Sequence, residues 1–251
     1  MASSLLAERQ AETELTSLKR SVRHAFTSLD VSRRKWASLS AAGKDALTAC
    51  ANGQSRLGHA EGAHLFAALK HLDAGASSAN GASGDRHRRG SSPALMLGSA
   101  VRRGVAIRAL QERHDSQLAV PPVMRGLEEV VAGMRRIVAE LEARVAAAAR
   151  VLGPERARTA PLVNTESATQ LVARAAAMAD AFARELSLRR AVTAEVVGAG
   201  REGSAARPGW DGAVKLYLSA WVLEPYVEHD VFEALLESLG GDEQPVRRRT
   251  M

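Results

Sequence analysis

The sequence predicts an all-α protein, built as an elongated antiparallel coiled coil or helical bundle with a small C-terminal helical unit. Apolar residues recur every three or four positions through most of the chain, as they do on one face of a helix. No stretch alternates apolar and polar residues between turn signals, so strands are not expected. Aromatic residues make up 4% of the 251 residues and alanine supplies much of the apolar fraction, which favours thin helix-to-helix seams over a thick core.

The N-terminal region, residues 1–72, is predicted to be mainly one long helix. Between Leu15 and Leu57, six of the seven positions spaced by seven are apolar, which is a heptad pattern. The seam of this predicted coiled coil begins with Leu15, Val22, Leu29 and Trp36. Residues 30–32 and Gly43 interrupt the pattern, and we expect the helix to kink or split at these points.

A stretch rich in glycine, serine and alanine, residues 73–93, follows this region. It has no apolar period and is predicted to be a disordered linker. A basic run precedes Ser91 and Ser92, which makes these two serines candidate kinase sites.

Residues 94–153 are predicted to form the central coiled-coil helices. The first has a loose apolar face that includes Val105 and Leu110, and we expect Pro121 and Pro122 to end it. The second has the cleanest apolar spacing in the chain. Its predicted seam comprises Leu127, Met134, Ile137 and Leu141.

Residues 164–240 are predicted to form the C-terminal helical unit. Asn164, Thr165 or Ser167 can cap its first helix. Ser167 would form a capping box with Gln170, in which each side chain bonds to the other residue's backbone amide. The last helices are short, and Pro225 is expected to separate them. A polar tail, residues 241–251, is predicted to be mobile.

The chain is basic, with a formal net charge of +6 and a pI of about 10.1. Its arginines occur in pairs among acidic neighbours without interleaved aromatic residues, so nucleic acid is not expected as a direct ligand. A basic, helical, nucleic-acid-associated protein is the alternative interpretation. We expect neither a membrane span nor a secretory leader, because no run of about 20 apolar residues occurs and the N-terminus soon becomes polar.

No motif predicts catalysis, a metal or a cofactor, and we expect none of the three. Histidines are scattered, without the cysteines or carboxylates that would complete a zinc site. Phosphate-binding loops and nucleophile elbows are absent from the sequence. Cys50 is the only cysteine, which fits a reducing intracellular compartment, and it falls on the heptad seam as a small buried thiol would.

The stretch FARELSLRRAVTAEV, residues 182–196, contains candidate partner-binding residues. Arg184, Glu185, Arg189 and Arg190 are predicted to form a solvated helix face with local ion pairs. In the alternative interpretation, Arg189 and Arg190 meet an acidic surface of a partner.

A second stretch, YLSAWVLEPYVEHD, covers residues 217–230. Trp221 is interpreted first as a core residue of a short helix. Pro225, Tyr226 and Glu228 are interpreted either as a simple turn or as a surface that binds a partner, because aromatic residues anchor many protein interfaces.

Together these two stretches resemble the cyclin-dependent-kinase-2-interacting protein family. That family has an aromatic-x-x-E-L-x-L-(K/R)-R-x-V-x-x-E block followed by a Y-L-S-x-W-x-x-x-P-Y-V-E-x-D block. The segment RKWASLSAAGKDALTACAN is more weakly similar to the family's K-W-x-x-L-x-x-x-G segment. The linker at residues 73–93 and the loop at residues 198–209 depart from the family's pattern.

The resemblance implies a non-catalytic adaptor that works in the nucleus and cytoplasm by binding other helical proteins. The partners it implies include a AAA-type ATPase complex, which acts in large-ribosomal-subunit maturation and in the turnover of replisome proteins. They also include cell-cycle kinases and kinases of the DNA replication and DNA damage checkpoint.

Overall fold

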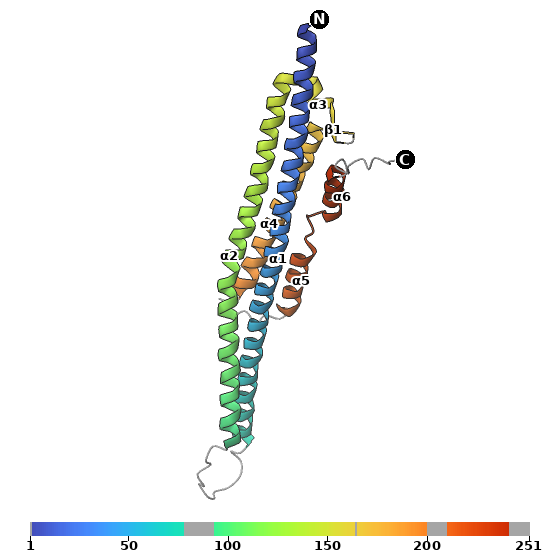
Figure 1. Ribbon diagram of the computed structural model, residues 1–251. Coiled ribbons are helices and arrows are strands. Elements are labelled where there is room, and N and C mark those ends of the chain that lie inside the picture. Colours follow the sequence, from blue (N-terminus) through green and yellow to red (C-terminus); the bar gives the residue numbers. More distant parts are fainter. Residues whose placement is uncertain (1, 78–92, 164, 200–209, 241–251) are drawn as a thin grey trace, which may run out of the picture. The chain divides into compact units, whose positions relative to one another are not determined.

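The computed structural model describes residues 2–77, 93–163, 165–199 and 210–240, and these residues form an all-α bundle (Figure 1). This confirms the predicted fold class. The helices are α1 (Ala2–Ser77), α2 (Pro93–Leu152), α3 (Pro154–Thr159), α4 (Ala168–Ala199), α5 (Trp210–Leu223) and α6 (His229–Gly240). No described helix has an apolar stretch long enough to cross a membrane.

A small antiparallel hairpin, which the sequence did not predict, joins α3 to α4. Its strands are β1 (Pro161–Val163) and β2 (Glu166–Ser167), and Pro161 lies opposite Ser167. Strands of three and two residues are too short to show an alternating pattern. The predicted capping box is confirmed, because the Ser167 amide donates to Gln170 Oε1 at 2.9 Å and the Gln170 amide donates to Ser167 Oγ at 3.4 Å.

Helix α1 is continuous through both points where a kink or split was expected, so the expectation of a split was wrong. Asp30 accepts ion pairs from Arg33 and Arg34, three and four residues further along, and these pairs stabilise the helix. Gly43 is buried because an indole needs the space: a Cβ atom there would lie 2.5 Å from Trp221 Cζ2. The helix continues to Ser77, and the rest of the predicted linker, residues 78–92, lies outside the described residues, as does the tail at 241–251.

Helix α2 is also continuous, and it contains Pro121 and Pro122, which were expected to end it. Proline removes a hydrogen bond from a helix interior, but flanking contacts can hold the helix together. Both prolines are exposed, while Val120 and Leu127 on either side of them are buried. Packing of the flanking turns therefore outweighs the local preference of the two prolines.

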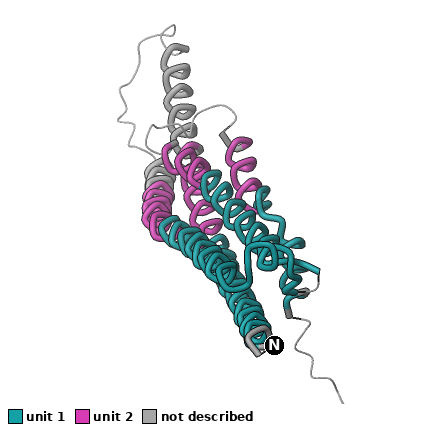
Figure 2. Tube along the Cα trace, turned by 90° about the horizontal axis from the view of Figure 1, so that it is seen from above, with its two compact units in different colours: residues 1–41, 124–189, 223–251 teal, residues 42–123, 190–222 magenta. Residues whose placement is uncertain are grey.

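The chain divides into two compact units, of which the first is assembled from three separate stretches and the second from two (Figure 2). Unit 1 comprises residues 1–41, 124–189 and 223–251, and unit 2 comprises residues 42–123 and 190–222, so that α2 passes from one unit to the other next to Pro122. Each unit thus contains parts of α1, α2 and α4.

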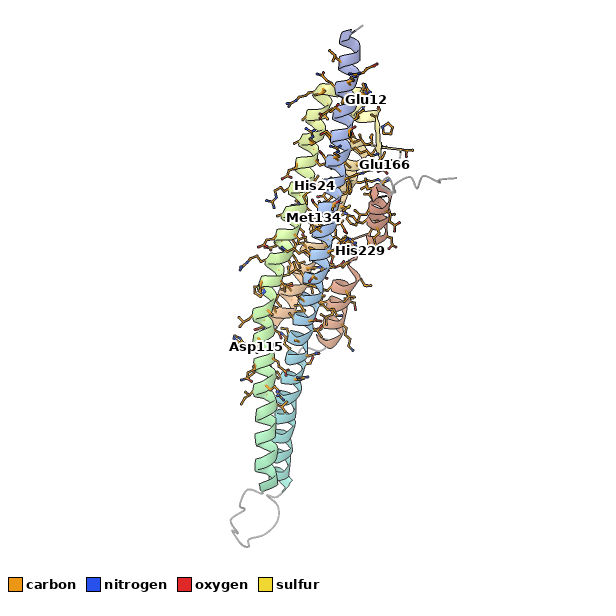
Figure 3. All side chains as sticks on the ribbon, in the orientation of Figure 1. Glu12, His24, Asp115, Met134, Glu166 and His229 are labelled. Atoms are coloured by element: carbon orange, nitrogen blue, oxygen red, sulfur yellow. The ribbon has the colours of Figure 1, made fainter. Side chains whose placement is uncertain are left out.

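In unit 1, α1 and α2 run antiparallel, because Glu14 pairs with Arg144 whereas Lys35 pairs with Glu129. Most of the predicted seam residues are buried; the fully buried ones include Met134, labelled in Figure 3. The buried members are Val22, Leu29, Trp36, Leu127, Met134 and Leu141, and the half-buried members are Leu15 and Ile137. The Trp36 ring packs edge-to-face against Phe182 on α4, with 5.1 Å between ring centroids.

In unit 2, α1 and α2 approach closely at Gly53, where a Cβ atom would lie 3.1 Å from the Ala109 carbonyl oxygen. Ala109 is buried, whereas Val105 and Leu110 are each 50% exposed, so the predicted apolar face was wrong at these two positions. The reason is the close approach of α1 and α2, because only small side chains such as that of Ala109 fit between the two helices. The side-chain amide of Gln54, also buried, donates to the Val196 carbonyl oxygen at 2.9 Å.

Candidate partner-binding site

The site begins at the turn that follows α5. Helix α5 ends at Leu223, and Glu224 has a φ of 45°, a left-handed conformation that is uncommon outside glycine. The Val227 amide donates to the Glu224 carbonyl oxygen at 2.9 Å and closes the turn over Pro225 and Tyr226. Residues 224–227 are called the Glu224 turn below.

The Glu224 carboxylate connects this turn to α1, α4 and α6. Its Oε1 atom accepts hydrogen bonds from Trp36 Nε1 and Ser40 Oγ on α1, both at 3.0 Å, and from the Arg189 guanidinium on α4. Its Oε2 atom lies 2.7 Å from Nε2 of His229, which begins α6 and is labelled in Figure 3. Three side chains distant in sequence, together with the nearby His229, thus hold one carboxylate, and such bonds offset the cost of its uncommon backbone conformation.

Arg189 and Glu185 are fully buried, which corrects the prediction of a solvated face for both residues. Arg189 Nε lies 3.2 Å from Glu185 Oε1, and the guanidinium also stacks over the Trp36 ring at 4.7 Å. Arg184 and Arg190 are exposed, as predicted. The sequence did contain a signal that Glu185 and Arg189 are buried. They follow the apolar Phe182 by three and seven residues, which places all three on the same face of the helix.

Burial affects the two carboxylates of this cluster in different ways. Burial raises the pKa of Glu185, and the neighbouring Arg189 and the Tyr226 amide offset this only in part. Burial also favours the neutral form of Glu224, but Arg189, His229, Trp36 and Ser40 outweigh it and hold the pKa of Glu224 below its usual value. Glu224 is therefore the anionic centre of the cluster.

A groove of about 340 Å³ lies beside the Glu224 turn, within unit 1. Helix α4 lines it with Ala177, Met178, Ala181 and Phe182. Helix α6 lines it with Val231, Phe232 and Leu235. Arg33, Arg174 and Arg184 add three cationic groups, and Glu228 adds one carboxylate. The site thus combines an apolar floor with a mainly basic rim, as protein-binding grooves often do.

The structure separates the sequence-predicted partner-binding residues into two groups. Arg189 and Trp221 are buried, Arg189 in the cluster of unit 1 and Trp221 beside Gly43 in unit 2. Pro225 and Tyr226 are exposed in the Glu224 turn, Tyr226 by 46%, and Glu228 is exposed directly after it. Arg190 is exposed as well, but it belongs to unit 2. Of these residues, Tyr226 and Glu228 line the groove, and Pro225 directly precedes Tyr226 in the turn.

Sequence reasoning missed the central role of Glu224 and its contacts with Ser40 and His229. The sequence did contain one indication, since Glu224 is a charged residue between an apolar helix and a proline. The position of Glu224 in the sequence does not, however, identify the residues of other helices that its carboxylate contacts. The part of the chain that the structure describes contains no cluster of three or more histidines, cysteines or carboxylates that could hold a metal ion.

No protein-family model matches the chain, and no curated protein matches it in sequence.

Proposed function

We propose that the protein is a non-catalytic adaptor that binds other proteins through the Glu224 turn and the adjoining groove. One observation carries this proposal. The Glu224 carboxylate is tied to α1, α4 and α6, while Pro225 and Tyr226 in the same turn remain exposed. A tyrosine on a pre-ordered turn is a favourable interface anchor, because it buries a large area and little conformational entropy is lost on binding.

The resemblance to the cyclin-dependent-kinase-2-interacting protein family suggests which proteins the adaptor binds. The Y-L-S-x-W-x-x-x-P-Y-V-E-x-D block contains Trp221, Pro225 and Tyr226, and the last two form the exposed part of the Glu224 turn. We therefore propose a AAA-type ATPase complex as a partner, with cell-cycle and replication-checkpoint kinases as further partners, in the nucleus and cytoplasm. The same resemblance supports roles in ribosome biogenesis and DNA replication.

The distribution of charge supports an adaptor over the alternative, a nucleic-acid-associated protein. Many arginines pair with acidic residues of the chain itself, which reduces the charge available to phosphates. These arginines are Arg33, Arg34, Arg56, Arg135, Arg144, Arg158, Arg174 and Arg189.

Affinity purification of the tagged full-length chain, followed by quantitative mass spectrometry, tests the proposal. We expect the wild-type chain to retain a AAA-type ATPase, and Tyr226→Ala to retain at least fivefold less. Leu216→Ala is the matched control, because Leu216 is 68% exposed on α5 and lies away from the Glu224 turn in sequence. Wild-type chain that retains neither the ATPase nor a cell-cycle kinase would contradict the proposal.

A further inference from the structure

The groove of unit 1 has a shape and charge that define one kind of occupant. We propose that it binds an amphipathic helix of a partner protein, with acidic residues at both ends of the helix's apolar stripe. This inference rests on the adaptor function proposed above, and it adds the chemistry of the segment that the adaptor recognises.

The length of the groove matches a short helix. Its α4 wall extends from Arg174 to Arg184, ten residues that correspond to about 15 Å along a helix. The other wall includes Glu228, which directly precedes α6, and Val231 and Leu235 of α6, and these three residues are also spaced by three and four positions. The groove is therefore lined by residues at helical spacing from both α4 and α6, and an added helix of about three turns presents side chains at i, i+3, i+4 and i+7 to such a surface.

The floor of the groove allows a close approach. Ala177 and Ala181 are one turn apart on α4 and have the smallest side chains of the lining. Small residues at this spacing let the larger side chains of a second helix fit between them, as ridges fit into grooves. Met178, a half-buried residue with a flexible side chain, lies beside them and provides apolar area for those side chains.

The charges of the groove favour an acidic occupant. Arg174 and Arg184 lie at the two ends of the α4 wall, and both are exposed. Arg174 contacts Glu166 through one nitrogen at 2.6 Å, and a guanidinium has further N–H donors that can bind a second carboxylate. Arg184 stacks over the Tyr226 ring at 5.9 Å and forms no ion pair with any described residue. An occupant with carboxylates about ten residues apart can therefore pair with both arginines.

The chain's own segments outside the described residues are a poor match for these charges. Residues 78–92, 200–209 and 241–251 each have a net positive formal charge. A segment of the same sign as the rim is repelled by it, which favours an acidic helix from another protein.

Selection from a phage-displayed library of random 16-residue peptides on the immobilised full-length chain tests the inference. Peptides that bind wild type are counter-selected on Ala177→Glu, which places a carboxylate on the floor of the groove. The matched control is Ala191→Glu, because Ala191 is exposed on α4 outside the groove lining. Circular dichroism establishes that both variants remain folded.

We expect the enriched peptides to have apolar residues at i, i+3, i+4 and i+7 with Asp or Glu at both ends. Their affinity should fall at least tenfold on Ala177→Glu and on Arg174→Glu/Arg184→Glu, and stay within twofold on Ala191→Glu. Basic or proline-rich peptides, or peptides that bind all variants equally, would overturn the inference. So would self-association in sedimentation experiments that Ala177→Glu abolishes, because the occupant would then be a second copy.

The two proposals fail in different ways. If the AAA-type ATPase is retained by wild type and by Ala177→Glu alike, the groove inference fails and the adaptor function stands. If no ATPase or kinase is retained at all, the adaptor function fails, whatever peptides the groove selects.

Discussion

Arg189, which is fully buried on α4, forms an ion pair with Glu224, 35 residues further along the chain. The same guanidinium binds Glu185, so one buried cation is shared by the fully buried Glu185 and the largely buried Glu224. Removing one member of such a cluster leaves a buried charge without its partner. The position of the Glu224 turn, and with it the exposure of Tyr226, therefore depends on Arg189.

Replacing this arginine should destabilise the fold strongly. We expect Arg189→Met to lower the free energy of unfolding by about 3–5 kcal/mol, because Glu185 and Glu224 lose their shared partner. Urea denaturation followed by circular dichroism measures the change. Arg136→Met, at an exposed position of α2, is the control and should change the free energy by less than about 0.5 kcal/mol. Equal effects of the two substitutions would show that the cluster contributes little.

Stability should fall in acid partly through Glu224. Its pKa is lower in the folded chain than in the unfolded chain, so the ionised carboxylate stabilises the fold above its ordinary pKa of 4.5. This contribution is lost as the pH falls through the folded pKa. Glu185 has a raised pKa and acts in the opposite direction, since its contribution is lost as the pH rises. Comparison of wild type with Glu224→Gln isolates the first effect.

We expect the wild-type chain to lose more stability than Glu224→Gln as the pH falls below about 4.5. Thermal unfolding at several pH values between the acidic and neutral ranges measures this difference. Parallel curves for the two proteins would mean that Glu224 has no lowered pKa in the folded state.

A pair of glycine substitutions tests the packing of Trp221. Gly43→Ala places a Cβ atom 2.5 Å from Trp221 Cζ2, so the indole must move, and we expect a loss of about 1–3 kcal/mol in the free energy of unfolding. Gly133→Ala meets no atom within 4 Å on α2, and we expect a gain of about 0.5–1 kcal/mol from helix propensity. Tryptophan fluorescence should change for Gly43→Ala only. A stabilising effect at Gly43 would contradict this packing.

The Cys50 thiol should be unreactive in the folded chain. Burial raises the pKa of Cys50, although Arg113 lowers it to a smaller extent, and the side chain is fully buried. We expect a thiol reagent such as dithionitrobenzoate to react at least a hundredfold more slowly with the native chain than with the chain in denaturant. Similar rates in the two states would indicate that this part of unit 2 opens readily.

The helical fold could be predicted because apolar spacing reports directly on which side of a helix is buried. Trp36, Leu127 and Leu141 lie on predicted seams and are buried. Local signals failed where packing decides the outcome. Pro122 lies within a continuous helix, and Gly43 is kept small for an indole about 180 residues away in sequence.

The exposed part of the site could also be predicted, since Pro225 and Tyr226 stand out in the sequence as a turn with an aromatic residue. Its buried part could not. Glu185 and Arg189 follow each other at the spacing of an ordinary surface ion pair, and only their shared contact with Glu224 distinguishes them. A tertiary contact of this kind leaves no pattern in a single sequence.

Site-specific photo-crosslinking in cells tests the central claim, that the Glu224 turn is a partner-binding surface, most directly. A benzophenone side chain introduced in place of Tyr226 should crosslink to a AAA-type ATPase or a cell-cycle kinase. The same group in place of Leu216, which is also exposed, should not. Crosslinks to the ATPase or kinase from position 216 but not from position 226 would contradict the claim.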